Sequence, residues 1–514
     1  MYTLGDLPRN GAALFGDRTA VVYEDNRYTY DQLNRRINRC AQALITLGLA
    51  PGDRLAVMAD NCAKYLELYF ATAKLGMSIT PLNVRLGDNE IDYILGDSEC
   101  SAFAVGDGYE PRAAGLRDRF AAVQHWFSHD TTLSGFHDYE GLLAGASEDE
   151  PDRDLYPVRE DDLAILMYTG GTTGVPKGVM LSHRNAMTAA IAAALQLGMT
   201  KDDSTCFALP IFHVAWWPIP MVLLVGGKAC IVRQPELNAM LSLIETERCT
   251  HLNLVPTVYG VLADDPRAAD YDLSSLRIMT YAGSPFPVAT LRRCIRRFGN
   301  IFTQAYGATE TAGGPITILD SADHHLDGDG DGARLLASAG RPAVCSRVKV
   351  VSAAETMLGP GEIGEVCVTG AHIMMGYWKN PELTAQALRG GWYHTGDMGY
   401  LDEQGFLFLT DRKSDMIISG GENVYPTEVE NVLHMHSAVL ECAVVGTVSD
   451  KWGETVHAVI VLRPGAAATA EELIDHCKST LAHYKAPKDI TFVESMPKTA
   501  IGKISRKVAK ELIK

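Results

Sequence analysis

Apolar and polar residues along the first half of the chain follow two different spacings. Short runs of apolar or β-branched residues, such as residues 54–58 and 79–82, are typical of buried strands. Between them, for example at residues 63–75, apolar residues recur three and four positions apart, which is the spacing of one helix face. This alternation predicts parallel β-α units, in which helices cover a sheet.

One predicted helix carries signals at both ends. Thr29 and Gln32 have the spacing of a capping box, in which each side chain accepts a hydrogen bond from the backbone N–H of the other residue. Ile37 and Leu44 belong to the apolar stripe that follows, and Gly48 is a typical helix terminator. We therefore expect a helix between Thr29 and Gly48.

The same alternation returns further along, and then the pattern changes twice. Strands are predicted at residues 206–209, 228–232, 252–255, 277–282 and 301–304. Past about residue 340, short strands split by Gly and Asp, such as 365–369 and 405–410, predict a β-rich subdomain. The last hundred residues predict a compact α+β unit, with helices near 426–434 and 471–481 and strands at 440–445, 457–462 and 490–493. We expect an α/β fold with a large N-terminal domain (residues 1–411) and a small α+β C-terminal domain (residues 412–514).

Composition limits the partners and the compartment. The 514 residues carry a net charge of −17, which disfavours nucleic acid, and 47% of them are hydrophobic, as in ordinary globular proteins. The longest apolar stretch, residues 214–225, is interrupted by Pro218 and Pro220, so we predict no transmembrane segment. Eleven scattered cysteines without a CxxC pair are typical of reduced thiols in a cytoplasmic protein.

A loop rich in glycine and threonine is the strongest chemical signal. Residues 168–178 read Tyr-Thr-Gly-Gly-Thr-Thr-Gly-Val-Pro-Lys-Gly and follow an apolar run at 163–167. The glycines let backbone N–H groups approach a ligand, the hydroxyls add donors, and Lys177 adds positive charge, so the loop suits a polyphosphate. Val175 and Pro176 stand before Lys177, which distinguishes the loop from a common P-loop.

Four further motifs accompany this loop. Residues 304–310, Gln-Ala-Tyr-Gly-Ala-Thr-Glu, combine an aromatic ring, a hydroxyl and a carboxylate, which suit a nucleobase, a phosphate and Mg²⁺. Residues 392–397 end on Asp397, a suitable acceptor for ribose hydroxyls. Residues 411–416 place Arg412 at the predicted domain boundary, and residues 497–503 present Lys503 after a glycine.

In this order, the motifs resemble those of the acyl-adenylate-forming superfamily, which includes acyl-CoA synthetases, amino-acid adenylation domains and firefly-type luciferases. The resemblance covers residues from about 10 to about 510 and is greatest for stand-alone bacterial fatty-acyl or aryl-acid CoA ligases. It implies ATP, Mg²⁺ and coenzyme A as cofactors and a C-terminal domain that rotates between two half-reactions. A carboxylate and MgATP would give acyl-AMP, which the thiol of CoA would then convert to acyl-CoA.

The resemblance also implies roles for individual residues. Lys503 would bridge the carboxylate and the α-phosphate, and Glu310 would bind Mg²⁺. The implied ATP and AMP site comprises Thr169, Gly170, Gly171, Thr172, Thr173, Gly174, Lys177, Gly283, Ser284, Pro285, Gln304, Ala305, Tyr306, Gly307, Thr309, Asp397 and Arg412. The implied CoA site comprises Ser419, Gly420, Gly421, Glu422, Trp452, Tyr484, Lys485 and Lys488.

His213 lies in a block that resembles the gate of the acyl pocket. Walls are expected from His213, Trp216, Trp217, Val255, Thr257, Tyr259, Tyr281, Gly283 and Gly307. This lining is apolar and aromatic, so we expect a hydrophobic medium- or long-chain fatty acid or an aryl acid. Loading of a carrier protein and a luciferase-like monooxygenation remain alternatives. The sequence does not determine the oligomeric state, and a dimer is possible.

Overall fold

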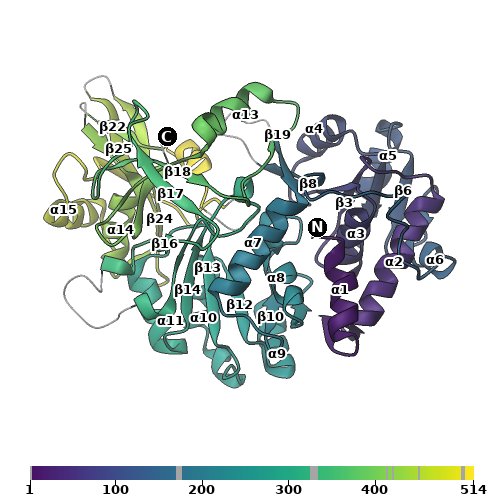
Figure 1. The fold of residues 1–514 in the computed structure, drawn as a ribbon. Helices are drawn as coiled ribbons and strands as arrows, with labels where there is room; N and C mark the ends of the chain where they lie inside the picture. The colour runs from purple at the N-terminus through teal and green to yellow at the C-terminus, as the bar shows by residue number, and fades with distance from the viewer. Residues whose placement is uncertain are drawn as a thin grey trace.

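The computed structural model describes residues 3–169, 176–324, 334–412, 415–419, 422–449, 452–498 and 504–513, without the side chains of Arg412 and Asn423. Within these ranges the chain forms four β-sheets. Figure 1 shows the purple N-terminal helices and the yellow C-terminal strands on opposite sides of the teal strands from residues 204–306.

The first sheet contains the strand that precedes the predicted phosphate loop. Its eight strands follow the order β19 (Gly376–Tyr377), β9 (Lys177–Ser182), β8 (Leu163–Thr169), β4 (Ser78–Pro81), β3 (Arg54–Met58), β5 (Ala102–Val105), β6 (His125–Ser128) and β7 (His137–Asp138). From β8 to β7, all six strands in this order run parallel to one another. Strand β9 runs antiparallel to β8.

The second sheet has nine strands and a parallel centre. Their order is β16 (Arg341–Pro342), β15 (Thr317–Leu319), β14 (Phe302–Tyr306), β13 (Ile278–Ala282), β12 (His251–Leu254), β10 (Ser204–Phe207), β11 (Lys228–Ile231), β1 (Thr19–Tyr23) and β2 (Asn26–Thr29). Because β12, β13 and β14 are parallel neighbours, the loops that follow them leave the sheet at one edge.

The third and fourth sheets are smaller. The third is antiparallel, in the order β17 (Arg347–Val351), β18 (Gly364–Thr369), β20 (Tyr393–Leu401) and β21 (Leu407–Arg412). The fourth contains β23 (Glu422–Val424), β22 (Ile417–Ser419), β25 (Gly453–Leu462) and β24 (Val439–Ser449), with β26 (Asp489–Phe492) parallel to β25. This last sheet has a core of its own, formed with helices α14 (Pro426–Met435) and α15 (Ala470–Thr480) and including Val429, Val444, Ile460 and Leu473.

Helices fill the connections between strands. They are α1 (Asp6–Phe15), α2 (Tyr30–Thr46), α3 (Ala63–Lys74), α4 (Asp88–Ser98), α5 (Glu110–Arg119), α6 (Tyr139–Ala144), α7 (His183–Gln196), α8 (Pro218–Leu224), α9 (Leu237–Glu247), α10 (Pro256–Asp264), α11 (Val288–Phe298), α13 (Pro381–Ala387), α14 (Pro426–Met435), α15 (Ala470–Thr480) and α16 (Arg506–Glu511). The short 3₁₀ helices η1 (Val214–Trp216) and η3 (Thr309–Thr311) follow β10 and β14.

Two large cores lie on the two faces of the second sheet. Core 1 joins the first two sheets and includes Tyr69, Ala189, Phe207, Trp216, Trp217 and Ile278. Core 2 covers the other face and includes Leu252, Leu254, Tyr259, Met279 and Tyr281. Along a strand, successive side chains therefore belong alternately to the two cores.

The α/β class and the large and small domains predicted from sequence are confirmed. The capping box of Thr29 and Gln32 starts α2, and β3 has the predicted bounds. The strands near 440–445 and 457–462 prove to be parts of one longer antiparallel pair, β24 and β25.

Candidate active site

The predicted phosphate loop connects two strands whose ends are paired. Thr169 at the end of β8 lies opposite Lys177 at the start of β9. Gly170, Gly171, Thr172, Thr173 and Gly174 lie outside the described residues. Next to the loop, a Cβ atom at Gly178 would lie 3.0 Å from Leu166 and 3.1 Å from Trp378, so little beyond glycine fits there. The hairpin therefore fixes both ends of the loop.

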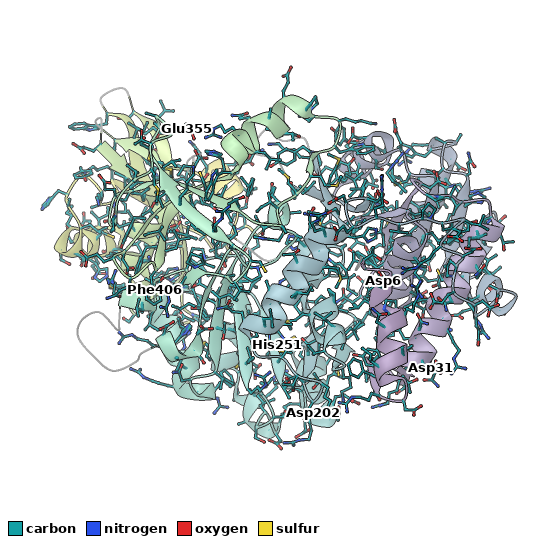
Figure 2. All side chains as sticks on the ribbon, in the orientation of Figure 1. Asp6, Asp31, Asp202, His251, Glu355 and Phe406 are labelled. Carbon is teal, nitrogen blue, oxygen red and sulfur yellow. The ribbon has the colours of Figure 1, made fainter. Side chains whose placement is uncertain are left out.

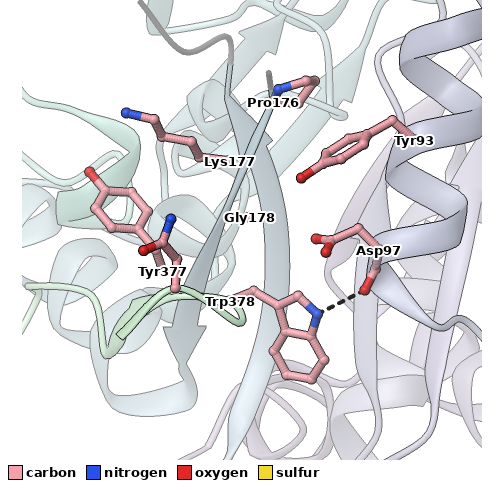
Figure 3. A pocket seen from close by; sticks show the side chains of 8 residues that line it. Tyr93, Asp97, Pro176, Lys177, Gly178, Tyr377 and Trp378 are labelled. Carbon is pink, nitrogen blue, oxygen red and sulfur yellow. Dashed lines mark hydrogen bonds between the residues drawn. The ribbon is translucent and has the colours of Figure 1, made fainter. Parts of the chain in front are cut away.

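A pocket lies beside this hairpin and faces α4. Figure 3 shows Lys177 and Tyr377 near one another and Tyr93 and Asp97 projecting from the helix on the opposite side. The indole N–H of Trp378 donates to the Asp97 carbonyl at 2.9 Å. Helix α4 is thus held against β19 across the pocket.

Tyr377 connects Lys177 with Glu310. Its phenol donates to Glu310 Oε1 at 2.9 Å, and its ring centroid lies 5.9 Å from Lys177 Nζ. Burial raises the pKa of Tyr377, so the phenol remains protonated and serves as a donor at neutral pH. Thr309 is buried beside Glu310 in η3. Tyr377 carries no local sequence signal of this role, because its position depends on a two-residue strand in which it pairs with Val179 of β9.

Glu310 suits the predicted Mg²⁺ site. Mg²⁺ in nucleotide-dependent enzymes is commonly held by one or two carboxylates together with phosphate oxygens and water. In the described part of the chain, no group of three or more His, Cys, Asp or Glu residues could hold a metal ion by itself. A single carboxylate beside the β8–β9 hairpin is compatible with a Mg²⁺ ion that binds together with ATP.

The two loops predicted to enclose adenine leave neighbouring strands. Ala282 of β13 lies opposite Ala305 of β14, so residues 283–285 and Gly307 follow at the same sheet edge. Gly283 has a φ of 87°, a left-handed conformation that favours glycine. A Cβ atom on Gly307 would lie 2.5 Å from the Gly314 carbonyl oxygen, so the close approach of these backbones requires glycine. Gln304 is half-buried on β14.

The predicted adenine and ribose residues are in direct contact. The Tyr306 phenol donates to Asp397 Oδ2 at 2.6 Å. Asp397 of β20 also lies opposite Arg412 of β21 in the third sheet. Tyr306, Asp397 and the Arg412 backbone are therefore brought together, although they come from three segments.

Of the predicted acyl-pocket residues, the two tryptophans belong to core 1. His213 caps η1, where its Nδ1 accepts from the Ala215 N–H at 3.4 Å. Trp216 is buried and stacks on Tyr69 with ring centroids 4.4 Å apart. Trp217 is buried in core 1 next to Gly313. A Cβ atom added to Gly313 would lie 3.1 Å from the Trp217 ring. Of the two tryptophans, the structure places Trp216 in a packing role.

Two predicted wall residues face core 2 instead. The Tyr259 phenol donates to the carbonyl oxygens of Leu252 and Thr280 at 2.8 and 3.0 Å. The Tyr281 phenol lies 3.0 Å from His324 Nε2. Val255 and Thr257 are half-buried, while Gly283 and Gly307 are exposed. The predicted wall residues thus do not all share one face of the sheet, and the proposed lining stays a prediction.

Part of the predicted CoA site comes together in the fourth sheet. Ser419 lies opposite both Glu422 and Gly453, which places Ser419 close to Trp452. The Trp452 side chain is 45% exposed, so it can meet a ligand from solvent. Gly420 and Gly421 lie outside the described residues.

The other CoA candidates lie after α15. Tyr484 is exposed, and Lys485 forms an ion pair with Glu428 at 2.7 Å. Lys488 Nζ donates to the His483 carbonyl at 3.2 Å. Both lysines therefore have protein partners that a phosphate would need to displace or share.

Lys503 lies outside the described residues, but the segment that follows it is firmly held. Arg506, the first residue of α16, donates to both carboxylate oxygens of Glu430, at 2.9 and 2.7 Å. It also forms an ion pair with Asp411 at the end of β21. Asp411 in turn accepts from the Thr427 N–H at 2.7 Å. Arg506 thus ties the segment after Lys503 to the predicted domain boundary.

Comparison with known proteins identifies the family. Residues 9–378 match the AMP-binding enzyme family, and residues 428–503 match the C-terminal domain of AMP-binding enzymes. The chain belongs to the AMP-binding enzyme family. It is 38% identical over 506 residues to a feruloyl-CoA synthase of an Amycolatopsis species, covering 98% of this chain and 97% of that protein.

Other relatives of this AMP-binding enzyme are also ligases. The long-chain-fatty-acid–CoA ligase FadD13 of Mycobacterium tuberculosis is 34% identical, with 95% of this chain and 93% of that protein covered. The solved structure of the amide bond synthetase McbA from Marinactinospora thermotolerans has a TM-score of 0.90 at 30% identity and covers 99% of both chains.

These similarities confirm the enzyme class predicted from sequence. The protein is an AMP-forming acid–thiol ligase of the acyl-CoA synthetase type, a class that uses ATP and CoA. The structure adds that no helix among the described residues is long and apolar enough to cross a bilayer.

Proposed function

We propose that this AMP-binding enzyme joins a hydrophobic carboxylic acid to CoA in two steps. The acid carboxylate attacks the α-phosphorus of ATP, which gives acyl-AMP and releases pyrophosphate. The CoA thiol then attacks the acyl carbonyl carbon and loses its proton, AMP leaves, and acyl-CoA is formed. Residues 1–411 would hold ATP and the acid, and residues 412–514 would carry Lys503 and the CoA-side turn.

The observation that carries this proposal is a chain of contacts through the ATP-side candidates. Lys177 lies by the Tyr377 ring, and Tyr377 bonds Glu310. Glu310 lies four residues after Tyr306 in the chain, and the Tyr306 phenol donates a hydrogen bond to Asp397. A cation, a carboxylate, a nucleobase-sized ring and a ribose acceptor thus form one connected set, as a nucleotide with its phosphates requires.

The residues of this set would act by position and charge. Lys177 and the Thr169–Lys177 loop would hold the β- and γ-phosphates, and Asp397 would accept from ribose. Glu310 would hold Mg²⁺, which when bound offsets negative charge on the phosphates. Lys503 would neutralise charge between the two reacting anions, because two negative groups meet in this step.

The acid is proposed to be a medium- or long-chain fatty acid or an aryl acid. Two relatives are named for feruloyl-CoA and for long-chain fatty acids, which supports both kinds of acid. The apolar residues around His213, with Trp217 buried beside them, support a hydrophobic acyl group.

The test is a panel of aryl and alkyl carboxylic acids, assayed for AMP release with MgATP in the presence and absence of CoA. We expect acid-dependent AMP release that rises at least tenfold when CoA is added. Glu310→Gln is the inactive reference, since it removes the metal-binding charge. AMP release that no acid stimulates would reject the ligase proposal. Turnover that requires a carrier protein or an amine instead of CoA would reject CoA as the acceptor.

A further inference from the structure

Asn253 is a buried side chain whose amide has no hydrogen-bond partner within the described structure. It lies on β12 and is 2% exposed. Neither its Oδ1 nor its Nδ2 atom is hydrogen-bonded among the described residues. A buried primary amide without partners destabilises a fold, so its presence calls for a ligand or a specific role.

The side chain points toward core 1. His251, two residues earlier on the same strand, bonds Thr280 at 2.9 Å and lies 3.3 Å from Thr205, so its ring has partners on this face of the sheet. His251, labelled in Figure 2, is completely buried. Because side chains alternate along a strand, Asn253 shares the face of His251, whereas Leu252 and Leu254 belong to core 2.

Asn253 belongs to a polar row that crosses three parallel strands. Asn253 lies opposite Thr280, and Thr280 lies opposite Thr303. The next row on this face, two residues nearer the carboxyl edge, contains the small pair Ala282 and Ala305. Those alanines precede the loops assigned to the nucleotide, so the polar row lies about 7 Å below the nucleotide site.

Helix α7 covers this face with small side chains. A Cβ atom at Gly314, past the carboxyl edge, would lie 2.5 Å from Ala189. Arg277, at the amino edge of β13, donates to the Leu197 carbonyl just after α7 at 3.4 Å. The helix therefore runs across the face from one edge to the other. Ala189 and Ala193, both buried, leave more room here than larger side chains would.

We propose that Asn253 determines substrate specificity by hydrogen-bonding a hydroxyl group at the far end of the acyl substrate. This inference rests on the proposed ligase function and narrows its acid to a hydroxyarene carboxylic acid. A phenol can donate to Oδ1 while it accepts from Nδ2, so it satisfies both halves of the amide. An alkyl chain can satisfy neither. A flat ring spans the distance from the Ala282–Ala305 row to the polar row.

The wild-type enzyme provides the first test, which needs no variant. Acid-dependent AMP release is compared for 4-hydroxycinnamate, 4-methoxycinnamate, cinnamate and decanoate. We expect kcat/KM to be at least tenfold higher for 4-hydroxycinnamate than for cinnamate, with the methoxy acid, which can only accept, in between. A site built for a hydroxyl discriminates strongly against analogues that lack one. Equal kcat/KM values for the hydroxylated and unsubstituted acids would overturn the assignment.

The second test uses Asn253→Leu, which keeps the number and branching of the side-chain heavy atoms and removes the hydrogen-bonding groups. We expect kcat/KM for 4-hydroxycinnamate to fall at least tenfold while that for cinnamate stays level or rises. Met279→Leu, on the adjacent strand but facing core 2, is the matched control and is expected to preserve the preference. An equal loss for both acids in Asn253→Leu would assign Asn253 a packing role and overturn the proposal. If Asn253→Leu fails to fold, the same two kcat/KM values are measured for Asn253→Val. If neither variant folds, the comparison of acids with the wild-type enzyme decides the proposal.

The outcomes also separate this inference from the ligase function. If no acid stimulates AMP release, the ligase proposal itself fails. If acids are activated with CoA but the hydroxyl makes no difference, the ligase function stands and only the role of Asn253 is rejected.

Discussion

The Tyr377 phenol donates a 2.9 Å hydrogen bond to Glu310, the carboxylate proposed to hold Mg²⁺. Its ring also lies 5.9 Å from the ammonium group of Lys177. A single side chain on a two-residue strand thus orients a carboxylate and lies against a cation, both assigned to the same polyphosphate.

Tyr377→Phe should weaken metal use more than it weakens the fold. The ring remains, but the hydrogen bond to Glu310 is lost, which is worth about 1–1.5 kcal/mol, or roughly a tenfold change. We expect the Mg²⁺ concentration for half-maximal AMP release to rise about five- to tenfold. Tyr271→Phe, a half-buried tyrosine in the loop after the 3₁₀ helix Pro266–Asp270, serves as the control. An unchanged Mg²⁺ dependence in Tyr377→Phe would remove Tyr377 from the site.

Lys503→Ala should separate the two half-reactions. Without its ammonium group, the carboxylate and the α-phosphate repel one another, so we expect adenylate formation to fall at least a hundredfold. Thioester formation from preformed acyl-AMP should remain within about threefold of wild type, because that step does not need this charge. Both rates are measured in single-turnover assays. An equal loss of both rates would contradict the assigned role.

Gly421→Leu is the reciprocal variant. Gly421 belongs to the segment assigned to the CoA site, so a leucine there should block the approach of the CoA thiol while adenylate formation persists. The expected result is acid-dependent pyrophosphate release with acyl-CoA formation reduced at least tenfold. Normal acyl-CoA formation by this variant would show that residues 419–422 do not line the path of the thiol.

Much of the fold and of the ATP side could be predicted because their signals are local. The capping box of Thr29 and Gln32 starts a helix by itself, and the Thr169–Lys177 loop carries its own chemistry. Tyr377 and Asn253 could not be found in this way. Tyr377 depends on a hydrogen-bond partner, and Asn253 is notable for lacking one among the described residues. Both situations are set by the pairing of strands from distant segments. The same cause explains Trp216, whose ring stacks on Tyr69 almost 150 residues earlier in the chain.

Arg506→Gln should destabilise the C-terminal unit. The guanidinium group neutralises the carboxylates of Glu430 and Asp411, and Asp411 is almost completely buried. Removing one partner of a buried ion pair typically costs about 3 kcal/mol. We expect a corresponding fall in the urea midpoint of this unit, followed by hydrogen exchange of the backbone amides in β24 and β25. Arg248→Gln, which disrupts an exposed pair with Asp272, should change it little, and equal effects of the two variants would contradict the structural role of Arg506.

Stability should fall in mild acid because buried histidines are neutral in the folded protein. Burial lowers the pKa of His251 to about 3 and that of His183 to about 4. The unfolded chain binds protons on these groups near pH 6.5, so it takes up more protons than the folded chain below that pH. The stabilisation is complete above pH 6.5 and is lost as the pH falls toward 4, by up to about 1.4 kcal/mol per pH unit for each group.

This dependence is measured as the free energy of unfolding between pH 7.5 and pH 5. The His251→Gln variant should show a shallower decline than wild type, whatever its stability at pH 7.5. Parallel curves for the two proteins would mean that His251 does not contribute to the acid sensitivity.

Strands β13 and β14 carry the loops assigned to the nucleotide at one end, and together with β12 they carry the Asn253–Thr280–Thr303 row in mid-strand. Which acid is chosen and how it is activated are therefore encoded at separate levels of the same sheet. Retargeting such a ligase can then proceed by substitutions at the middle level alone, with the loops that grip ATP left untouched.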